Sequence, residues 1–258
     1  TTRRPAGRPS GRPILNGGER VREETGRLGM LLGDEAMERL GAAHVIVFGL
    51  GGVGSWCAEA LARSGVGRLT LVDEDSVSVS NRNRQLCALG STVGRAKAEV
   101  MAERLRDIAP VADIVPVAAR YEAESRERFF PGDYSFVADC IDLVSCKLDL
   151  IETALGADIP IVSALGTGNK LDASLLRLCD ISETYGCPLA RVMRKELRRR
   201  GIERLQVVFS PEEARETEQT ETPPPGRRSV PGSAVWVPAS AGLLMAQAIV
   251  LKIAGVET

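Results

Sequence analysis

The chain has 258 residues, 44% hydrophobic and 26% charged, with a net charge of −1. This is ordinary globular composition, and the near-neutral charge excludes a global electrostatic attraction to nucleic acid or membrane. The length allows one large α/β domain or two small ones, with a core that needs no disulfides. None of the six cysteines forms a Cys-x-x-Cys pair, which argues against structural zinc. With no signal-peptide pattern, we expect a cytoplasmic protein with reduced thiols.

Residues 1–20 are rich in Arg, Gly and Pro and show no apolar period. We expect a disordered basic tail, for which a solvated role is more common than contact with RNA. Residues 24–41 predict a helix, because apolar side chains recur there at helical spacing. The apolar stripe consists of Leu28, Leu31, Leu32, Ala36 and Leu40.

Residues 44–54 carry the most informative motif. Val45–Phe48 is typical of a buried parallel strand, and Ser55–Arg63 predicts a helix. The turn between them fits G-x-G-x-x-G, in which glycine permits a tight turn and a close approach of the backbone to phosphate. The amides at the helix start then point at that phosphate. The glycines of the pattern are Gly49, Gly51 and Gly54.

A second strand, Arg68–Val72, ends on Asp73. That acid lies about 20 residues past the glycines, where a ribose-binding carboxylate is expected. Residues 74–85 form a polar loop, and residues 94–108 predict a helix with Lys97 in its first turn. A lysine there opposes the helix dipole unless an anion lies nearby. The candidate polar side chains of the loop are Asp75, Asn81, Arg84 and Gln85.

Further strands predict a Rossmann-like, mostly parallel α/β sheet with helices on both faces and antiparallel additions near the C-terminus. They are expected at 111–117, 134–139, 160–164, 175–178 and 205–209. The second of these ends on Asp139 and is followed by Asp142, and acids at the carboxyl end of a parallel strand face the ligand crevice of such a sheet. A helix is expected over 143–155, and a glycine-rich loop over 165–169.

Residues 191–204 contain seven basic and two acidic side chains. Met193 and Leu197 can face inward at helical spacing, which leaves a strongly positive outer face suited to phosphate-backbone contacts. A solvated helix is the alternative. The local excess of charge in a nearly neutral chain favours nucleic-acid contact. The candidate contact residues are Arg191, Arg194, Lys195, Arg198 and Arg199.

Two segments near the C-terminus differ sharply in composition. Residues 210–232 are rich in Pro, Glu and Thr and predict a mobile crossing loop. Residues 239–254 are apolar on nearly all sides. A transmembrane helix is conceivable, but Gln247 and Lys252 interrupt a run that is already short of about 20 residues. We therefore expect a buried core helix or a dimer-packing helix.

Five motifs together carry a family resemblance: Gly49-Leu-Gly-Gly-Val-Gly54, Asp73-Glu-Asp75, Asn81-Arg-Asn-Arg84-Gln85, Lys97 and Asp142. They resemble the MoeB/ThiF/HesA adenylating family, relatives of ubiquitin-activating enzymes, and the resemblance covers about residues 24–254. Three further stretches are similar to the members that dehydrate threonylcarbamoyladenosine in tRNA. These are Gly166-Thr-Gly-Asn-Lys-Leu-Asp172, Cys187-Pro-Leu-Ala-Arg-Val-Met-Arg-Lys-Glu-Leu-Arg198 and Pro238-Ala-Ser-Ala-Gly-Leu243.

The resemblance implies a single adenylating domain over 24–256 and specific roles for its residues. Gly52 and its neighbours would lie against ATP, and Asp73 would hold the ribose hydroxyls. Arg84 and Lys97 would bind the triphosphate, and Asp142 would carry Mg²⁺. Arg27 matches an arginine that reaches into the partner subunit's site in homodimers of the family. The resemblance also raises a bound monovalent cation and cysteine desulfurase or sulfur-acceptor partners.

The implied reaction is ATP-dependent dehydration of threonylcarbamoyladenosine in tRNA. Its carboxylate would attack the α-phosphate, and the side chain would then close a ring on the acyl-adenylate. Adenylation of a ubiquitin-like sulfur carrier is the alternative, but relatives with that activity usually carry two Cys-x-x-Cys pairs. Cys187 is more simply a packed thiol than a nucleophile. An NAD-dependent dehydrogenase is disfavoured because the usual acid/base residues for hydride transfer are missing. The only histidine, His44, begins the first strand and lies away from any ligand edge. A non-catalytic nucleotide-sensing or RNA-binding module also remains open.

Overall fold

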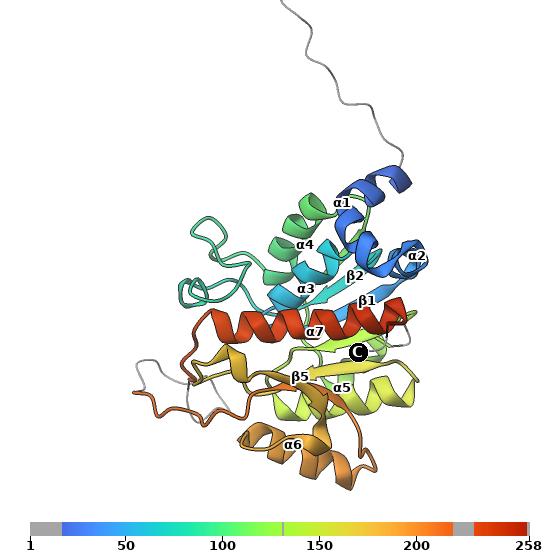
Figure 1. Ribbon diagram of the computed structural model, residues 1–258. Coiled ribbons are helices and arrows are strands. Elements are labelled where there is room, and N and C mark those ends of the chain that lie inside the picture. The colour runs from blue at the N-terminus through green and yellow to red at the C-terminus, as the bar shows by residue number, and fades with distance from the viewer. Residues whose placement is uncertain (1–16, 131, 219–229, 257–258) are drawn as a thin grey trace, which may run out of the picture.

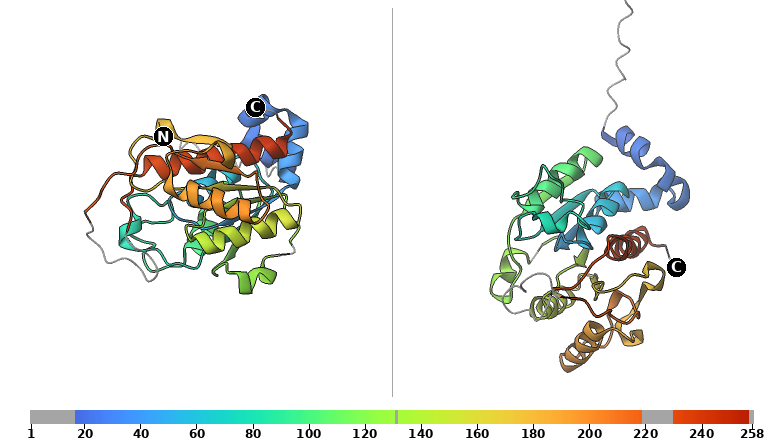
Figure 2. Two further views of the ribbon diagram at one scale, coloured as in Figure 1. Left: turned by 90° about the horizontal axis from the view of Figure 1, so that it is seen from below. Right: turned by 90° about the vertical axis from the view of Figure 1, so that its left-hand side faces the viewer.

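The computed structural model describes residues 17–130, 132–218 and 230–256. A seven-stranded sheet forms its centre, with helices packed against both faces (Figure 1 and Figure 2). The strand order is β3-β2-β1-β4-β5-β7-β6, and β6 pairs with β7 in antiparallel fashion while the other neighbours are parallel. The strands are β1 His44–Phe48, β2 Arg68–Val72, β3 Asp113–Val117, β4 Phe136–Asp139, β5 Ile161–Ala164, β6 Arg177–Asp180 and β7 Gln206–Phe209.

Strand β1 is buried along its whole length, as its continuous apolar sequence predicts. Successive side chains of a strand point to opposite faces of the sheet. Val45 and Val47 therefore pack into the core layer shared with α3, α4 and α7, whereas Ile46 and Phe48 pack into the layer shared with α5 and α6. The two layers explain why both faces of the sheet are covered.

Seven α-helices are described, joined by short 3-10 turns. The helices are α1 Gly17–Leu32, α2 Asp34–Ala42, α3 Gly54–Arg63, α4 Lys97–Ile108, α5 Val144–Gly156, α6 Pro188–Arg199 and α7 Trp236–Ala254. The 3-10 turns are η1 Val79–Asn81, η2 Ala123–Arg128, η3 Ala173–Leu175 and η4 Ile181–Glu183. Helix α6 begins with proline, which tolerates the first helical position, and α7 ends before the left-handed Gly255.

The predicted fold class is confirmed, with local differences. The single helix expected over 24–41 is two helices, because Gly33 adopts a left-handed φ of 84° and interrupts the helical backbone. Helix α1 begins at Gly17, so the last residues of the expected disordered tail are helical, and residues 1–16 lie outside the described chain. Helix α6 ends at Arg199, before the left-handed Gly201, rather than continuing to 204.

Strand β6 and the crossing segment also differ from expectation. The strand expected at 175–178 is displaced to Arg177–Asp180, where it adds an antiparallel edge. Residues 210–218 and 230–232 of the expected mobile loop are described. Several of their backbone groups, and the Glu212 carboxylate, are hydrogen bonded to the 169–172 segment. Residues 219–229 lie outside the described chain.

Helix α7 is the one helix of the described residues that is long and apolar enough to cross a membrane. Its mean hydropathy is 1.6, but 61% of the apolar window is buried inside the protein. It packs against α2, α3 and the central sheet, and Figure 1 shows it running across the molecule. Helix α7 is thus a core helix by its packing.

Asp139, the last residue of β4, is buried rather than turned to the ligand edge. Asp139 and Lys147 are fully buried, and their Oδ2 and Nζ atoms lie 2.6 Å apart. Ser163 completes the cluster by donating to Asp139 and accepting from Lys147. The other carboxylate oxygen of Asp139 accepts the backbone N–H of Ile141, 3.1 Å away. Asp139 therefore fixes the loop that follows β4.

We expect Lys147→Met to destabilise the fold strongly, because the Asp139 carboxylate would remain buried without its counter-ion. Breaking such a pair costs about 3–5 kcal/mol of unfolding free energy. Urea unfolding followed by circular dichroism measures the change. Lys252→Met, at an exposed lysine on α7, is the matched control. Equal effects of the two substitutions would contradict the role of the buried pair.

Candidate functional site

The glycine turn after β1 lies at the carboxyl edge of the sheet and leaves no room for side chains. Gly49 has a left-handed φ of 86°, and a Cβ on it would lie 2.7 Å from the Cys140 carbonyl oxygen. A Cβ on Gly54 would lie 1.8 Å from the Gly49 carbonyl oxygen. The turn therefore brings the backbone of β1, the start of α3 and the loop after β4 into direct contact.

Helix α7 and the 78–85 loop also pack against the glycine turn. A Cβ on Gly52 would lie 3.1 Å from Pro238 and 3.5 Å from Arg84. Gly242 of α7 packs so closely on α3 that a Cβ there would lie 2.3 Å from the Val53 carbonyl oxygen. Ser55 donates to the Gly51 carbonyl oxygen at 2.6 Å. The local sequence pattern does not predict the packing of Gly52 and Gly242, although a serine that follows a glycine turn often bonds to the backbone at a helix start.

Asp73 follows β2, as predicted, and its carboxylate faces the glycine turn. Its Oδ2 accepts the Leu50 N–H at 2.6 Å, and its Oδ1 accepts the Asp75 N–H at 2.8 Å. Burial raises the pKa of Asp73, and the nearby Lys97 charge and these two hydrogen bonds oppose that shift. A carboxylate has about four acceptor positions, so two remain for a ligand.

Lys97 is the first residue of α4, and the anion that its position requires is Asp75. The Lys97 Nζ lies 2.8 Å from Asp75 Oδ2, and the Lys97 backbone N–H donates to the Asp75 carbonyl oxygen at 2.9 Å. The Lys97 side chain is 6% exposed, whereas that of Asp75 is 62% exposed. The cation is thus fixed by packing, and its partner is accessible to solvent.

The 78–85 loop places Arg84 beside Gly52. Asn81 closes the loop by accepting the Ser78 N–H at 3.1 Å. The Arg84 guanidinium donates to the Ser80 carbonyl oxygen and to Asn83, and the Arg84 carbonyl oxygen accepts from the Trp56 indole. Gln85 is buried, with its amide near Gly51. The structure therefore gathers Asp73, Asp75, Arg84, Gln85 and Lys97 around the glycine turn.

Asp142 lies in the loop between β4 and α5, next to the loop that carries the glycine turn. Because β4 neighbours β1, both loops leave the same edge of the sheet. The Asp142 side chain is exposed. Among the described residues, no three His, Cys, Asp or Glu side chains are grouped closely enough to hold a metal ion by themselves. Mg²⁺ needs only one or two carboxylates when substrate phosphates and water supply the other oxygens, so this edge fits that ion.

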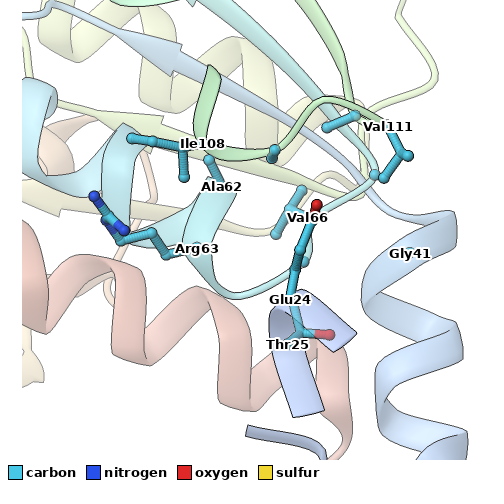
Figure 3. A pocket seen from close by; sticks show the side chains of 12 residues that line it. Glu24, Thr25, Gly41, Ala62, Arg63, Val66, Ile108 and Val111 are labelled. Atoms are coloured by element: carbon cyan, nitrogen blue, oxygen red, sulfur yellow. The ribbon is translucent and has the colours of Figure 1, made fainter. Parts of the chain in front are cut away.

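Arg27 is not brought to this edge within the chain. It is exposed on α1, whose Thr25 contacts the loop before β2 at the amino edge of the sheet. A cavity of about 420 Å³ lies there, beneath α1 (Figure 3). Its walls come from α1, α3, α4 and the loops preceding β2 and β3, and include Thr25, Arg63 and Val111. This cavity lies at the amino edge of the sheet, whereas the glycine turn lies at the carboxyl edge. It therefore forms no part of the predicted nucleotide site.

Helix α6 carries the predicted basic face on the layer opposite α7. Met193 and Leu197 are buried, as expected, and Arg191, Lys195 and Arg198 are exposed. Arg194 instead bonds to the carbonyl and hydroxyl oxygens of Thr184. Arg199 pairs with Glu196 on the same helix. The face open to an anionic partner is therefore narrower than the sequence suggests.

Cys187 is the N-terminal cap of α6 and is buried. Its Sγ accepts the Ala190 N–H at 3.5 Å and lies beneath Gly166, where a Cβ would approach it to 3.3 Å. At 4% exposure the thiol has no open approach for a bulky acyl group. The packing agrees with a structural thiol.

The ThiF family profile matches residues 26–258. The chain belongs to the ThiF family. It is 40% identical over 233 residues to the tRNA threonylcarbamoyladenosine dehydratase of Bacillus subtilis, which covers 87% of this chain and 92% of that protein. The structure of Escherichia coli tRNA N6-threonylcarbamoyladenosine dehydratase, TcdA, in complex with ATP matches with a TM-score of 0.82 at 36% identity. That match covers 91% of this chain and 95% of TcdA.

An adenylyltransferase is similar to the chain over a shorter stretch. The molybdopterin-synthase adenylyltransferase of Salmonella typhimurium is 41% identical over 153 residues, which is 59% of this chain and 61% of that protein. The resemblance to the adenylating family is thus confirmed, and the similarity to the dehydratases extends over more of the chain.

We expect Gly54→Ala to disrupt the glycine turn of this ThiF-family chain. The new methyl group would overlap the Gly49 carbonyl oxygen, and such overpacking costs about 1–3 kcal/mol of unfolding free energy. Gly90→Ala is the control, since a Cβ at Gly90 meets nothing within 4 Å. Urea unfolding compares the variants, and equal stabilities would contradict the close approach described for the turn.

Proposed function

We propose that the protein catalyses ATP-dependent dehydration of threonylcarbamoyladenosine in tRNA, through an acyl-adenylate of the threonyl carboxylate. The observation that carries this proposal is the match to the Bacillus subtilis dehydratase over nearly the full length of both chains. The groups collected around the glycine turn supply a second, independent support. They suit a reaction that needs positioning and charge stabilisation and no side-chain nucleophile.

The nucleotide half of the proposed site uses the edge formed by β2 and β1. The remaining acceptor positions of Asp73 hold the ribose hydroxyls, and the glycine backbone from Gly49 to Gly54 lies against the phosphates. The amides at the start of α3 point toward the same anion. Arg84 lies beside Gly52 and faces the triphosphate, and Gln85 and Asn81 hold the loop in place.

Lys97 would change partner when ATP binds. Its ammonium is nearly buried and cannot move far, whereas Asp75 is mostly exposed and can turn into solvent. A triphosphate oxygen would therefore take the place of the Asp75 carboxylate on Lys97. Asp75 orients the Lys97 ammonium in the free protein.

Asp142 is the proposed Mg²⁺ ligand, at the meeting point of the β1 and β4 loops. When bound, Mg²⁺ would neutralise phosphate charge and make the α-phosphorus a better electrophile. Lys97 and Arg84 stabilise the charge that gathers on the phosphorus oxygens as the threonyl carboxylate attacks. The attack breaks the bond between the α-phosphorus and the bridging oxygen and releases pyrophosphate, which leaves the acyl-adenylate. Ring closure by the same threonylcarbamoyl side chain then releases AMP. This intramolecular acceptor explains how a chain with a buried Cys187 can complete the reaction.

We also propose that two copies of the chain form the active enzyme, with Arg27 acting in the partner's site. Arg27 lies at the amino edge of its own sheet, across the molecule from its own glycine turn. Met30 and Leu31 beside it are 87% and 82% exposed, which is unusual for large apolar side chains. A second copy packed on α1 would cover them.

The tRNA would dock on α6. Arg191, Lys195 and Arg198 present an exposed positive face at spacings of three and four residues, which match one side of a helix. Arg194 contributes through its bonds to Thr184, by holding the helix on the domain. Contacts of these cations with the phosphate backbone would supply affinity that falls with salt.

Adenylation of a ubiquitin-like sulfur carrier is the second candidate. The similarity to the Salmonella typhimurium molybdopterin-synthase adenylyltransferase favours it, because the adenylation chemistry is shared. The whole sequence has no Cys-x-x-Cys pair, and the 210–232 segment has no cysteine. Both features make the sulfur-carrier function the weaker candidate.

Incubation of threonylcarbamoyladenosine-containing tRNA with the purified protein, ATP and Mg²⁺ tests the proposal. Mass spectrometry of the nucleosides is expected to find the loss of one water, only when ATP is present. Asp142→Ala and Lys97→Ala are expected to reduce the rate by at least about 100-fold, because each removes charge stabilisation at the reacting phosphate.

Circular dichroism would establish that both variants are folded. Full activity in folded variants would refute the assigned site. An unchanged nucleoside with the wild-type protein, together with adenylation of a carrier protein ending in Gly-Gly, would favour the second candidate instead.

Charge reversal on α6 tests the docking surface. The triple variant Arg191→Glu, Lys195→Glu and Arg198→Glu should weaken tRNA binding and leave ATP affinity unchanged, since the glycine turn lies elsewhere. The slope of log affinity against log salt should fall by about one unit for each phosphate that the variant no longer neutralises. Arg128→Glu with Lys252→Glu reverses exposed charges outside α6 and is the control. Equal tRNA affinities of both variants would exclude α6 as the docking face.

A further inference from the structure

The 166–172 loop lies between β5 and η3. It is hydrogen bonded to both ends of the segment, residues 210–235, that connects β7 to α7. It leaves the carboxyl edge of the sheet, where the neighbouring strands β4 and β7 also end. Its hydrogen bonds reach residues 210–215 on one side and Gly232 on the other. These contacts fall outside the nucleotide half of the site.

Lys170 supplies the first of these bonds from a buried position. It is 3% exposed, and its Nζ donates to the Ser210 carbonyl oxygen at 2.5 Å. Burial lowers the pKa of Lys170, and the nearby Glu212 carboxylate opposes that shift. A buried lysine carries a desolvation cost that a surface lysine avoids. The hydrogen bond of Lys170 to Ser210 therefore links the 166–172 loop specifically to the end of β7.

Glu212 supplies the second link. Its carboxylate accepts the backbone N–H groups of Leu171 and Asp172, each at 3.0 Å from one of its oxygens. Charge-assisted bonds to backbone N–H groups are stronger than neutral ones. The Arg215 N–H adds a third link by donating to the Asn169 carbonyl oxygen at 2.8 Å. Residues 210–215 are thus fixed on the loop at three points.

Asn169 fixes the other end of the segment. It adopts a left-handed φ of 59°, which is uncommon outside glycine. In that conformation its N–H donates to the Gly232 carbonyl oxygen at 2.7 Å, and its side-chain oxygen accepts the Gly232 N–H at 2.6 Å. One residue further on, the Ser233 carbonyl oxygen accepts from Asn83, the neighbour of Arg84. Gly232 and Ser233 are therefore hydrogen bonded to the 166–172 loop and to the loop that carries Arg84, respectively.

The order of strands places this loop on the acceptor side of the reaction. Along the carboxyl edge lie Asp73 after β2, the glycine turn after β1, Asp142 after β4 and then the 166–172 loop after β5. With the ribose at Asp73 and the phosphates at the glycine turn, the attacking carboxylate must approach from beyond Asp142. Helix α6 begins beneath this loop, at Cys187 under Gly166.

We propose that Lys170 and Glu212 are positioning residues for the nucleoside half of the site, where they hold the 166–172 loop and residues 210–215 in a single arrangement against which the modified nucleoside is oriented. This inference rests on the proposed tRNA dehydratase function. Neither residue is assigned a contact with the reacting atoms. Their removal loosens the acceptor side and leaves the nucleotide side intact.

The variants Lys170→Met and Glu212→Ala test the inference. Lys170→Met keeps the length of the side chain and removes its charge and hydrogen bond. Glu212→Ala acts at a partly exposed position and removes the acceptor of the Leu171 and Asp172 amides. The matched controls are Lys252→Met and Glu213→Ala, which remove the same charges from exposed positions.

For each protein, ATP affinity is measured by titration calorimetry, and kcat and KM are measured for tRNA dehydration. We expect kcat to fall by about 10-fold or more in both variants, since small displacements of a reactant reduce rates steeply. The ATP Kd should stay within about 3-fold of the wild type, since 1.4 kcal/mol corresponds to tenfold. The controls should match the wild type in all three quantities.

Hydrogen exchange of the free protein gives a readout that needs no substrate. The Leu171 and Asp172 amides should exchange faster in Glu212→Ala than in Glu213→Ala. Unchanged exchange, unchanged kcat, or a loss of ATP affinity parallel to the loss of kcat would overturn the positioning role. If the wild-type protein failed to dehydrate the tRNA, the proposed function would fall instead, and the exchange of the two amides would still decide whether Glu212 holds the loop.

Discussion

The close approach of Gly54 to the Gly49 carbonyl oxygen is the constraint on which the candidate site depends. It allows the chain to leave β1, turn sharply and enter α3 while touching the Cys140 carbonyl oxygen at the end of β4. Gly242 extends the same close packing to α7. Because four elements meet without intervening side chains, the backbone of the glycine turn cannot shift without moving the sheet. This contact therefore fixes the positions of the two neighbouring loops, which carry Asp73 and Asp142.

Two lysine–aspartate pairs near this edge show how burial separates structural from functional charge. Lys147 and Asp139 are both fully buried, so neither can be offered to a ligand without a large desolvation cost. Lys97 is buried, but its partner Asp75 is mostly exposed. An incoming anion can replace an exposed partner at little cost, because the displaced carboxylate returns to water. The same pair of residue types therefore fixes a loop in one place and, in the other, leaves a lysine whose partner an anion could replace, as the proposed site requires.

Much of the fold and part of the site could be predicted because the signals are local. The β-branched strand, the glycine spacing and Asp73 lie within one βαβ unit and determine each other's geometry. The break at Gly33 was concealed by an apolar stripe that continues across it, although Asp34 and Glu35 mark a new helix start. The burial of Asp139 and the internal bonds of Arg194 depend on residues far away in sequence, which no local pattern reports.

The strand order explains why nucleotide and acceptor would meet at one point. The order β3-β2-β1 runs one way from β1, and β4-β5-β7 runs the other way, so the loops after β1 and β4 diverge to helices on opposite faces. Open α/β sheets bind their ligands at such a switch point. Here the glycine turn lies on one side of that point and the Asp142 loop on the other. The strands beyond β4 then carry the 166–172 loop and α6, so the proposed tRNA substrate would approach from that side without crossing a nucleotide held at the glycine turn.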